Sequence, residues 1–98
     1  MKHFLIYVTY QTKPGCREHF VKELREQGVL EAILAEDGGY RYEYFFSDQD
    51  ENRLLLLEEW ESEAHQQIHI KQPHMARALE LKAKYVETAH VGKYSLLL

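Results

Sequence analysis

Three histidines in the second half of the chain offer side chains for acid–base chemistry or metal binding. His65 and His69 stand four residues apart, and His74 follows a proline. Residues with this spacing lie on the same side of a helix, so the first two histidines form a pair. Because histidine changes charge near neutral pH, it is suited to take a proton from a bound molecule. We predict His69 as a general base; the alternative is a buried histidine that fastens its helix to the sheet by a hydrogen bond.

The same histidine pair has a spacing that can bind a metal ion. In the segment HQQIH, residues 65–69, glutamine stands where zinc proteases carry their catalytic glutamate. A third ligand would have to come from His74 or from a remote carboxylate. The chain has a single cysteine, Cys16, which we interpret as a small residue at a helix start. We therefore expect no metal site.

Glu58 and Trp60 precede the histidines and share one face of a strand, because strand side chains alternate. Glu58 could orient a histidine or raise its basicity, and it is our second catalytic candidate. The alternative is a pairing with a basic residue at the strand end. Trp60 could line a pocket or close the core beneath the helix.

Tyrosines at alternate positions of YRYEYFF, residues 40–46, form an aromatic stripe with phenolic donors. Such a stripe could hold a flat aromatic ligand, or it could be sheet core or a dimer contact. His74 could gate a pocket or cap a helix. The candidate substrate-binding residues are Trp60, His65, His74, Tyr42 and Tyr44.

The elements that position these residues follow one compact order. We predict strands at residues 4–10, 40–46, 54–60 and 88–98. We predict a helix over 17–35 that Gly28 bends or interrupts, and a helix over 63–71 capped by Ser62. Gln72 and Pro73 break this second helix, which continues from Pro73 to about residue 85. The order β-α-β-β-α-β predicts an α+β, ferredoxin-like fold with a four-stranded antiparallel sheet. We expect one domain over residues 1–98.

The strand that contains Leu54, Leu55, Leu56 and Leu57 is apolar on both faces. One face can pack on the chain's own helices, and the other needs a partner or a closed cavity. This strand therefore predicts a homodimer with an internal pocket.

Composition excludes several classes of partner. The chain has 98 residues, enough for one modest core, and a net charge of −4 with mixed signs. Nothing resembles a basic footprint for nucleic acid. We expect no membrane span and no signal peptide. A single cysteine cannot form an intrachain disulfide, which favours a reducing, cytoplasmic location.

The segment EEWESEAHQQIHIKQPHM, residues 58–75, resembles the antibiotic biosynthesis monooxygenase (ABM) family, especially its small bacterial quinol-monooxygenase-like members. The resemblance implies a homodimer described as a dimeric α/β barrel. For some members it also implies oxidation of phenols or quinols by O₂ without metal or flavin. Other members are isomerases, haem-degrading oxygenases or proteins of no known activity.

The haem-degrading branch uses an asparagine in the first strand, a tryptophan in the second helix and a histidine ligand beyond it. Here the first strand has no asparagine, the tryptophan position holds His69, and the ligand position falls near Leu79. We therefore expect neither haem binding nor haem breakdown.

Oxygenation without a cofactor sets clear requirements. Ground-state O₂ reacts slowly with neutral organic molecules because of its spin, whereas an electron-rich phenolate can give it an electron. The protein must remove a proton, hold the anion and exclude water. We therefore predict a cofactor-independent monooxygenase for a small phenol- or quinol-type substrate. The alternatives are an isomerase that uses the same histidine and a non-catalytic, ligand-binding dimer.

Overall fold

The computed structural model describes residues 2–97. Within this range four strands and four helices follow the order β-α-α-β-β-α-α-β. The strands are β1 (Lys2–Thr12), β2 (Gly39–Phe46), β3 (Arg53–Trp60) and β4 (Val86–Leu97). The helices are α1 (Arg17–Glu26), α2 (Val29–Leu34), α3 (Glu63–His69) and α4 (His74–Tyr85).

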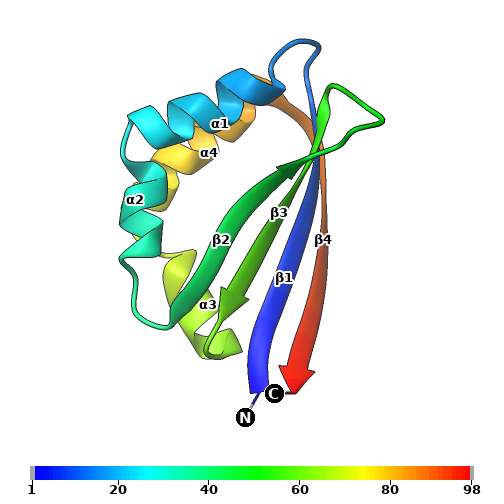
Figure 1. The fold of residues 1–98 in the computed structure, drawn as a ribbon. Helices are drawn as coiled ribbons and strands as arrows, with labels where there is room; N and C mark the ends of the chain where they lie inside the picture. The colour runs from blue at the N-terminus through cyan, green and yellow to red at the C-terminus, as the bar shows by residue number, and fades with distance from the viewer. Residues whose placement is uncertain (1, 98) are drawn as a thin grey trace.

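The strands form one antiparallel sheet in the spatial order β2-β3-β1-β4, with the two outer strands reached by helical connections. The helices gather on one side of this sheet (Figure 1). This is the ferredoxin-like arrangement that the order of elements predicts. None of the helices in the described range is long and apolar enough to cross a membrane.

Each helical connection consists of two helices, divided where the sequence predicts an interruption at Gly28 and a break at Pro73. Gly28 adopts a φ of 76°, a left-handed conformation that glycine tolerates well, and it separates α1 from α2. Pro73 precedes α4, and a short connection separates α4 from α3. The Ser62 hydroxyl accepts a hydrogen bond from the backbone N–H of His65, as expected for the residue that caps α3. The helix α3 is thus short: it begins after Ser62 and ends at His69, whose side chain packs on Trp60 of the sheet.

Alternate residues of the two central strands build the core under the helices. Val8 and Tyr10 of β1 pair with Leu56 and Leu54 of β3, and all four are buried. Phe20 of α1 covers them and is completely buried. Leu54 and Leu56 are thus the leucines of β3 that face the helices.

The opposite face of the sheet carries the remaining apolar side chains. Leu55 and Leu57 of β3 and Leu5 of β1 are half-buried, whereas Phe45 of β2 is 42% exposed. The described helices do not cover this face (Figure 1). The strand is therefore apolar on both sides, as its sequence indicates.

The predicted tyrosine stripe is wrong for Tyr40. The pairing of β2 with β3 shifts between Gly39 and Arg41, so strict alternation is lost at this point. Tyr40 instead stacks on His3, with ring centroids 4.6 Å apart, and its hydroxyl contacts Glu61. Beyond the irregularity, the rings of Tyr42 and Tyr44 lie in edge-to-face contact on the helix side.

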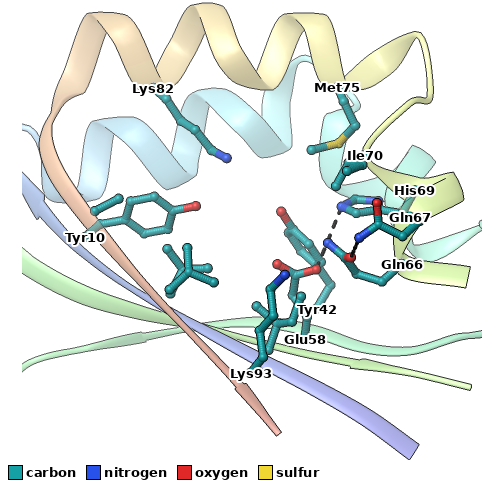
Figure 2. Close-up of a pocket in the computed structure, with 14 residues that line it drawn as sticks. Tyr10, Tyr42, Glu58, Gln66, Gln67, His69, Ile70, Met75, Lys82 and Lys93 are labelled. Carbon is teal, nitrogen blue, oxygen red and sulfur yellow. Dashed lines mark hydrogen bonds and ion pairs between the residues drawn. The ribbon is translucent and has the colours of Figure 1, made fainter. Parts of the chain in front are cut away.

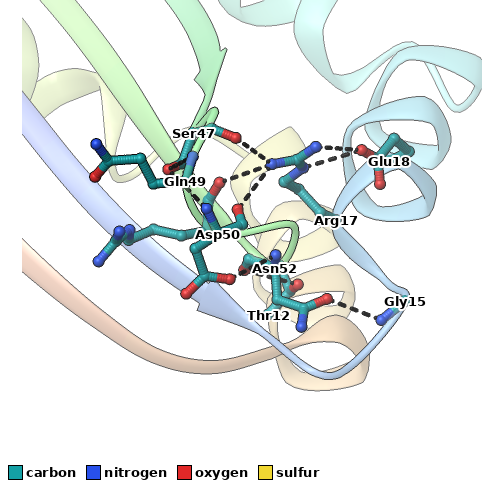
Figure 3. A network of polar contacts seen from close by, with 9 residues as sticks. Thr12, Gly15, Arg17, Glu18, Ser47, Gln49, Asp50 and Asn52 are labelled. Atoms are coloured by element: carbon teal, nitrogen blue, oxygen red, sulfur yellow. Dashed lines mark hydrogen bonds and ion pairs between the residues drawn. The ribbon is translucent and has the colours of Figure 1, made fainter.

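A polar network joins the start of α1 to the β2–β3 hairpin (Figure 3). Arg17 donates from Nη1 to the backbone carbonyls of Ser47, Asp50 and Arg53 at 2.9, 3.0 and 3.3 Å. Asn52 accepts from the backbone N–H of Gly15 at 2.9 Å. These bonds satisfy backbone groups of two turns and fix the end of the sheet distant from α3.

Candidate functional site

A cavity of about 340 Å³ lies between the sheet and helices α3 and α4 (Figure 2). This volume falls within the usual range for sites of small organic ligands. Its apolar wall consists of Ile6, Val8, Ile70, Met75, Ala89 and Val91. Its polar wall consists of Tyr10, Tyr42, Glu58, Gln66, Gln67, His69, Lys82 and Lys93. The cavity therefore combines apolar walls with groups able to donate or accept protons.

His69, the last residue of α3, is the most deeply buried polar side chain in the described lining of this cavity. It is 1% exposed, and its ring lies 4.6 Å from that of Trp60 and 5.6 Å from that of Tyr42, between centroids. Its Nδ1 lies 2.9 Å from Glu36 Oε2, and its Nε2 lies 3.8 Å from Glu58 Oε1. The two ring nitrogens therefore face two different carboxyl groups.

Glu36, in the turn between α2 and β2, determines how that imidazole is oriented. Its Oε2 lies 2.9 Å from His69 Nδ1 and 2.7 Å from His74 Nε2. A carboxylate can only accept hydrogen bonds, so each of these nitrogens donates to it. In neutral His69 the proton is then on Nδ1, and the lone pair of Nε2 is directed toward Glu58.

Glu58 of β3 is 5% exposed and accepts a hydrogen bond of 2.9 Å from Trp60 Nε1. Burial raises the pKa of Glu58, although the Trp60 hydrogen bond and the nearby His69 oppose that rise. An acid with a raised pKa inside a ligand-sized cavity is typical of a functional site, although structural networks also produce such shifts.

Three other cavity groups are perturbed by burial. Burial raises the pKa of the Tyr10 and Tyr42 hydroxyls, so both stay protonated and can donate hydrogen bonds. Burial lowers the pKa of the Lys82 amine, while Glu58 opposes that change. In Figure 2 the amine of Lys82 and the hydroxyl of Tyr10 point into the same space. The cavity thus has hydrogen-bond donors opposite His69 and Glu58.

The sequence-predicted site residues are distributed over more than one region. Among them, His69, Glu58 and Tyr42 line the cavity, and Trp60 packs on His69 from within the core. Tyr44 lines a different groove, beside α1, α2 and β2.

The other two histidines also lie outside the cavity lining. His74 contacts Glu36. The ring of His65 covers Gly38, its Nδ1 lies 2.7 Å from Ser62 Oγ, and it lines a small hollow of about 140 Å³. His69 and His74 therefore share Glu36 as a partner, whereas His65 lies apart from both.

Several cavity residues were missed by the sequence analysis. Lys82 follows Met75 by seven residues, two helical turns, and this spacing on one face of α4 could have indicated it. Tyr10 and Gln66 carry no comparable signal, because each also fits an ordinary core or helix position. Glu36 lies in a turn 33 residues before His69, so only the folded chain brings the two together.

Solved structures share this fold at low sequence identity. Protein SO0527 from Shewanella oneidensis is 20% identical, with coverage of 97% of this chain and 91% of that chain and a TM-score of 0.85. A protein from Nitrosomonas europaea, named provisionally as an antibiotic biosynthesis monooxygenase, is 21% identical, with coverage of 97% and 90% and a TM-score of 0.86. A conserved protein from Methanosarcina mazei Go1 is 22% identical, with coverage of 96% and 92% and a TM-score of 0.85. Likeness at this identity establishes the fold alone.

The family assignment comes from the sequence itself. No curated protein sequence matches the chain significantly. The antibiotic biosynthesis monooxygenase pattern, however, matches residues 3–81, a range that includes Tyr10, Glu36, Glu58, His69 and His74. The chain belongs to the antibiotic biosynthesis monooxygenase family.

Proposed function

We propose that this protein is a monooxygenase that oxidises a small phenol- or quinol-type molecule with O₂ in the cavity beneath α3 and α4, without metal or flavin. The observation that carries the proposal is the position of His69. This buried imidazole is held at Nδ1 by Glu36 and faces Glu58 with Nε2, on the wall of a ligand-sized cavity.

The first step is removal of the phenolic proton by His69 Nε2. Glu36 fixes the tautomer that leaves this nitrogen free to accept, in the way a carboxylate orients the histidine of a catalytic triad. The rings of Trp60 and Tyr42 hold the imidazole in place. Glu58, protonated more readily than an exposed glutamate, can receive or return a proton next to it.

The resulting phenolate needs positive charge and hydrogen-bond donors in a site with little water. Lys82 and the hydroxyls of Tyr10 and Tyr42 provide them, since all three line the same cavity. Donors fixed before the reaction stabilise a developing anion more than mobile water does. The apolar wall, including Val8 and Met75, restricts the space left for water.

The substrate itself supplies all the electrons in this scheme. A phenol with a free ring position and O₂ give a quinone and water: one oxygen atom of O₂ enters the ring and the other leaves as water. Four electrons pass from the ring to O₂, beginning with transfer from the phenolate. Two protons end in the water: the phenolic proton that His69 removes and the proton of the ring carbon that is oxygenated. The reaction therefore balances without an external reductant.

We also propose a homodimer that buries the outer face of the sheet. Leu5, Leu55, Leu57 and Phe45 on that face support the proposal, because an apolar surface of this kind is costly to expose. Light scattering at micromolar concentration is expected to give twice the chain mass, and Leu55→Asp is expected to reduce it to the monomer or prevent folding. A compact monomer of the wild-type protein would refute the dimer.

Oxygen uptake with a panel of phenols and quinols, in buffer with a chelator, tests the proposed activity. The wild-type protein is expected to consume O₂ with at least one of them, and His69→Ala to lose most of that uptake. His65→Ala is a suitable control, because it changes another histidine of α3 that lines a different hollow. Conversion of a substrate under nitrogen would instead favour an isomerase, and binding without turnover would favour a ligand-binding protein.

A further inference from the structure

The contacts of Glu36 with His69 and His74 bring together a donor set that the sequence alone does not reveal. Glu36 comes from the turn after α2, His69 ends α3 and His74 begins α4. One ligand atom of each residue lies within 4.8 Å of the other two. Two imidazoles and a carboxylate are ligands that zinc and related divalent metal ions prefer.

We propose that Glu36, His69 and His74 form a binding site for a divalent transition-metal ion of the Zn²⁺ type. Ligand atoms around tetrahedral zinc lie about 3.4 Å apart, given bonds of about 2.1 Å. Glu36 Oε2 now lies 2.9 Å from one imidazole nitrogen and 2.7 Å from the other. A small outward movement of the three side chains would therefore admit an ion, which takes the place of the two hydrogen bonds.

Two further observations support an ion at this position. The second nitrogen of His69, Nε2, faces the Glu58 carboxyl at 3.8 Å, and metal-binding histidines commonly have a carboxyl group as their outer partner. A hollow of about 140 Å³ lined by Glu36, Asp37 and His65 lies next to the cluster. It has room for water ligands and a path of entry, and Asp37, which is almost fully exposed, adds negative charge.

The ion would lie behind the His69 ring rather than in the substrate cavity. It would bind at Nδ1, whereas the cavity lining, as described, contains neither Glu36 nor His74. A neutral imidazole that ligates through Nδ1 carries its proton on Nε2 and cannot take another there. The ion therefore switches off the base, and this consequence rests on the proposed function.

Metal binding can be measured without any assay of activity. Tag-free protein stripped with a chelator is titrated with ZnCl₂ by calorimetry and with Co²⁺ by absorption spectroscopy. We expect one ion per chain, and nitrogen NMR shifts that place the metal on His69 Nδ1. His74→Ala is expected to weaken binding by more than the roughly 10- to 100-fold that loss of an outer partner costs. His19→Ala, which removes an exposed histidine of α1, is the matched control and is expected to leave binding unchanged.

Glu36→Gln provides a second variant if His74→Ala does not fold, because it keeps the shape of the side chain and removes its charge. We expect this variant also to bind Zn²⁺ weakly. The proposal is overturned if the wild-type protein binds no Zn²⁺, or if both folded variants bind it as tightly as the His19→Ala control. If Zn²⁺ binds at the three residues but oxygen uptake does not respond, the site stands and the proposed role of His69 as the base fails.

Discussion

The Arg17 network and the Glu58 cavity are both polar regions enclosed by the fold, yet they are arranged in opposite ways. The Arg17 guanidinium donates to three backbone carbonyls and pairs with the Glu18 carboxylate, so the fold itself supplies its partners. Glu58, Lys82 and Tyr10 line the cavity, and burial shifts the pKa of each in the direction that favours its neutral form. Polar groups that stabilise a fold have their hydrogen-bond partners within that fold. Polar groups that line a cavity can instead form hydrogen bonds to a bound ligand.

The largest expected effect concerns His69 and separates activity from folding. His69→Ala should lower turnover by about a hundredfold or more, the usual scale for losing a general base. The melting temperature and turnover of the same variant are measured together. Unfolding of this variant would support the structural interpretation of His69, and a folded variant with full turnover would place the base elsewhere, with Glu58 as the next candidate.

Arg17→Ala should have the opposite effect from His69→Ala: it should lower stability and leave turnover unchanged. It removes three hydrogen bonds to carbonyls of the hairpin, so the free energy of unfolding should fall by roughly 1–3 kcal/mol. Urea denaturation measures the loss, and turnover below the unfolding transition should be unchanged. Arg77→Ala serves as the control, since Arg77 forms a more exposed ion pair of the kind that contributes little. Equal losses in the two variants would contradict the structural importance of the network.

Lys82→Met should have a smaller effect on activity. Methionine keeps the length of the side chain and removes the charge that would stabilise a phenolate, so kcat/KM should fall by about tenfold, equivalent to one weak electrostatic contact. Lys84→Met, two residues farther along α4 and outside the described lining of the cavity, is the comparison. An unchanged kcat/KM in Lys82→Met would remove Lys82 from the proposed site.

The smallest effect is expected in the pH dependence of stability. Burial raises the pKa of Glu58 in the folded protein, so the folded state binds more protons than the unfolded state between the ordinary glutamate pKa and that raised value. Stability should therefore fall as the pH rises through this window, and the loss should persist above it. Glu58→Gln keeps an acceptor for Trp60 and should remove this part of the decline. Melting temperatures of the wild type and of Glu58→Gln that change equally between pH 4 and pH 8 would contradict this prediction.

The fold could be predicted because its signals are local. Strand alternation, the Ser62 cap, Gly28 and Pro73 act within a few residues, and together they specify the order of elements. The irregularity at Tyr40 could not be predicted, because it depends on how β2 pairs with β3. Pattern alone assumes unbroken alternation, and it therefore placed Tyr40 on the wrong face.

The candidate site was predicted only in part, for a related reason. His69 and Glu58 lie in the segment that resembles the family, and Glu58 is hydrogen-bonded to Trp60. Glu36 has no sequence signal, since its contact with His69 depends on the packing of a turn against a helix end. The sequence also could not predict that His65 lies outside the cavity. Two residues four apart lie on the same side of a helix, but on a short helix they can line different pockets.

Isotope labelling with ¹⁸O₂ tests the central claim most directly. A phenol or quinol that supports oxygen uptake is turned over by the wild-type protein under ¹⁸O₂ with a chelator present. The quinone is reduced at once, so that its oxygen does not exchange with water, and its mass is measured. We predict one ¹⁸O atom in each product molecule and its loss in His69→Ala. Product that contains no ¹⁸O, or equal labelling by the His69→Ala variant, would contradict a monooxygenase that uses His69 as its base.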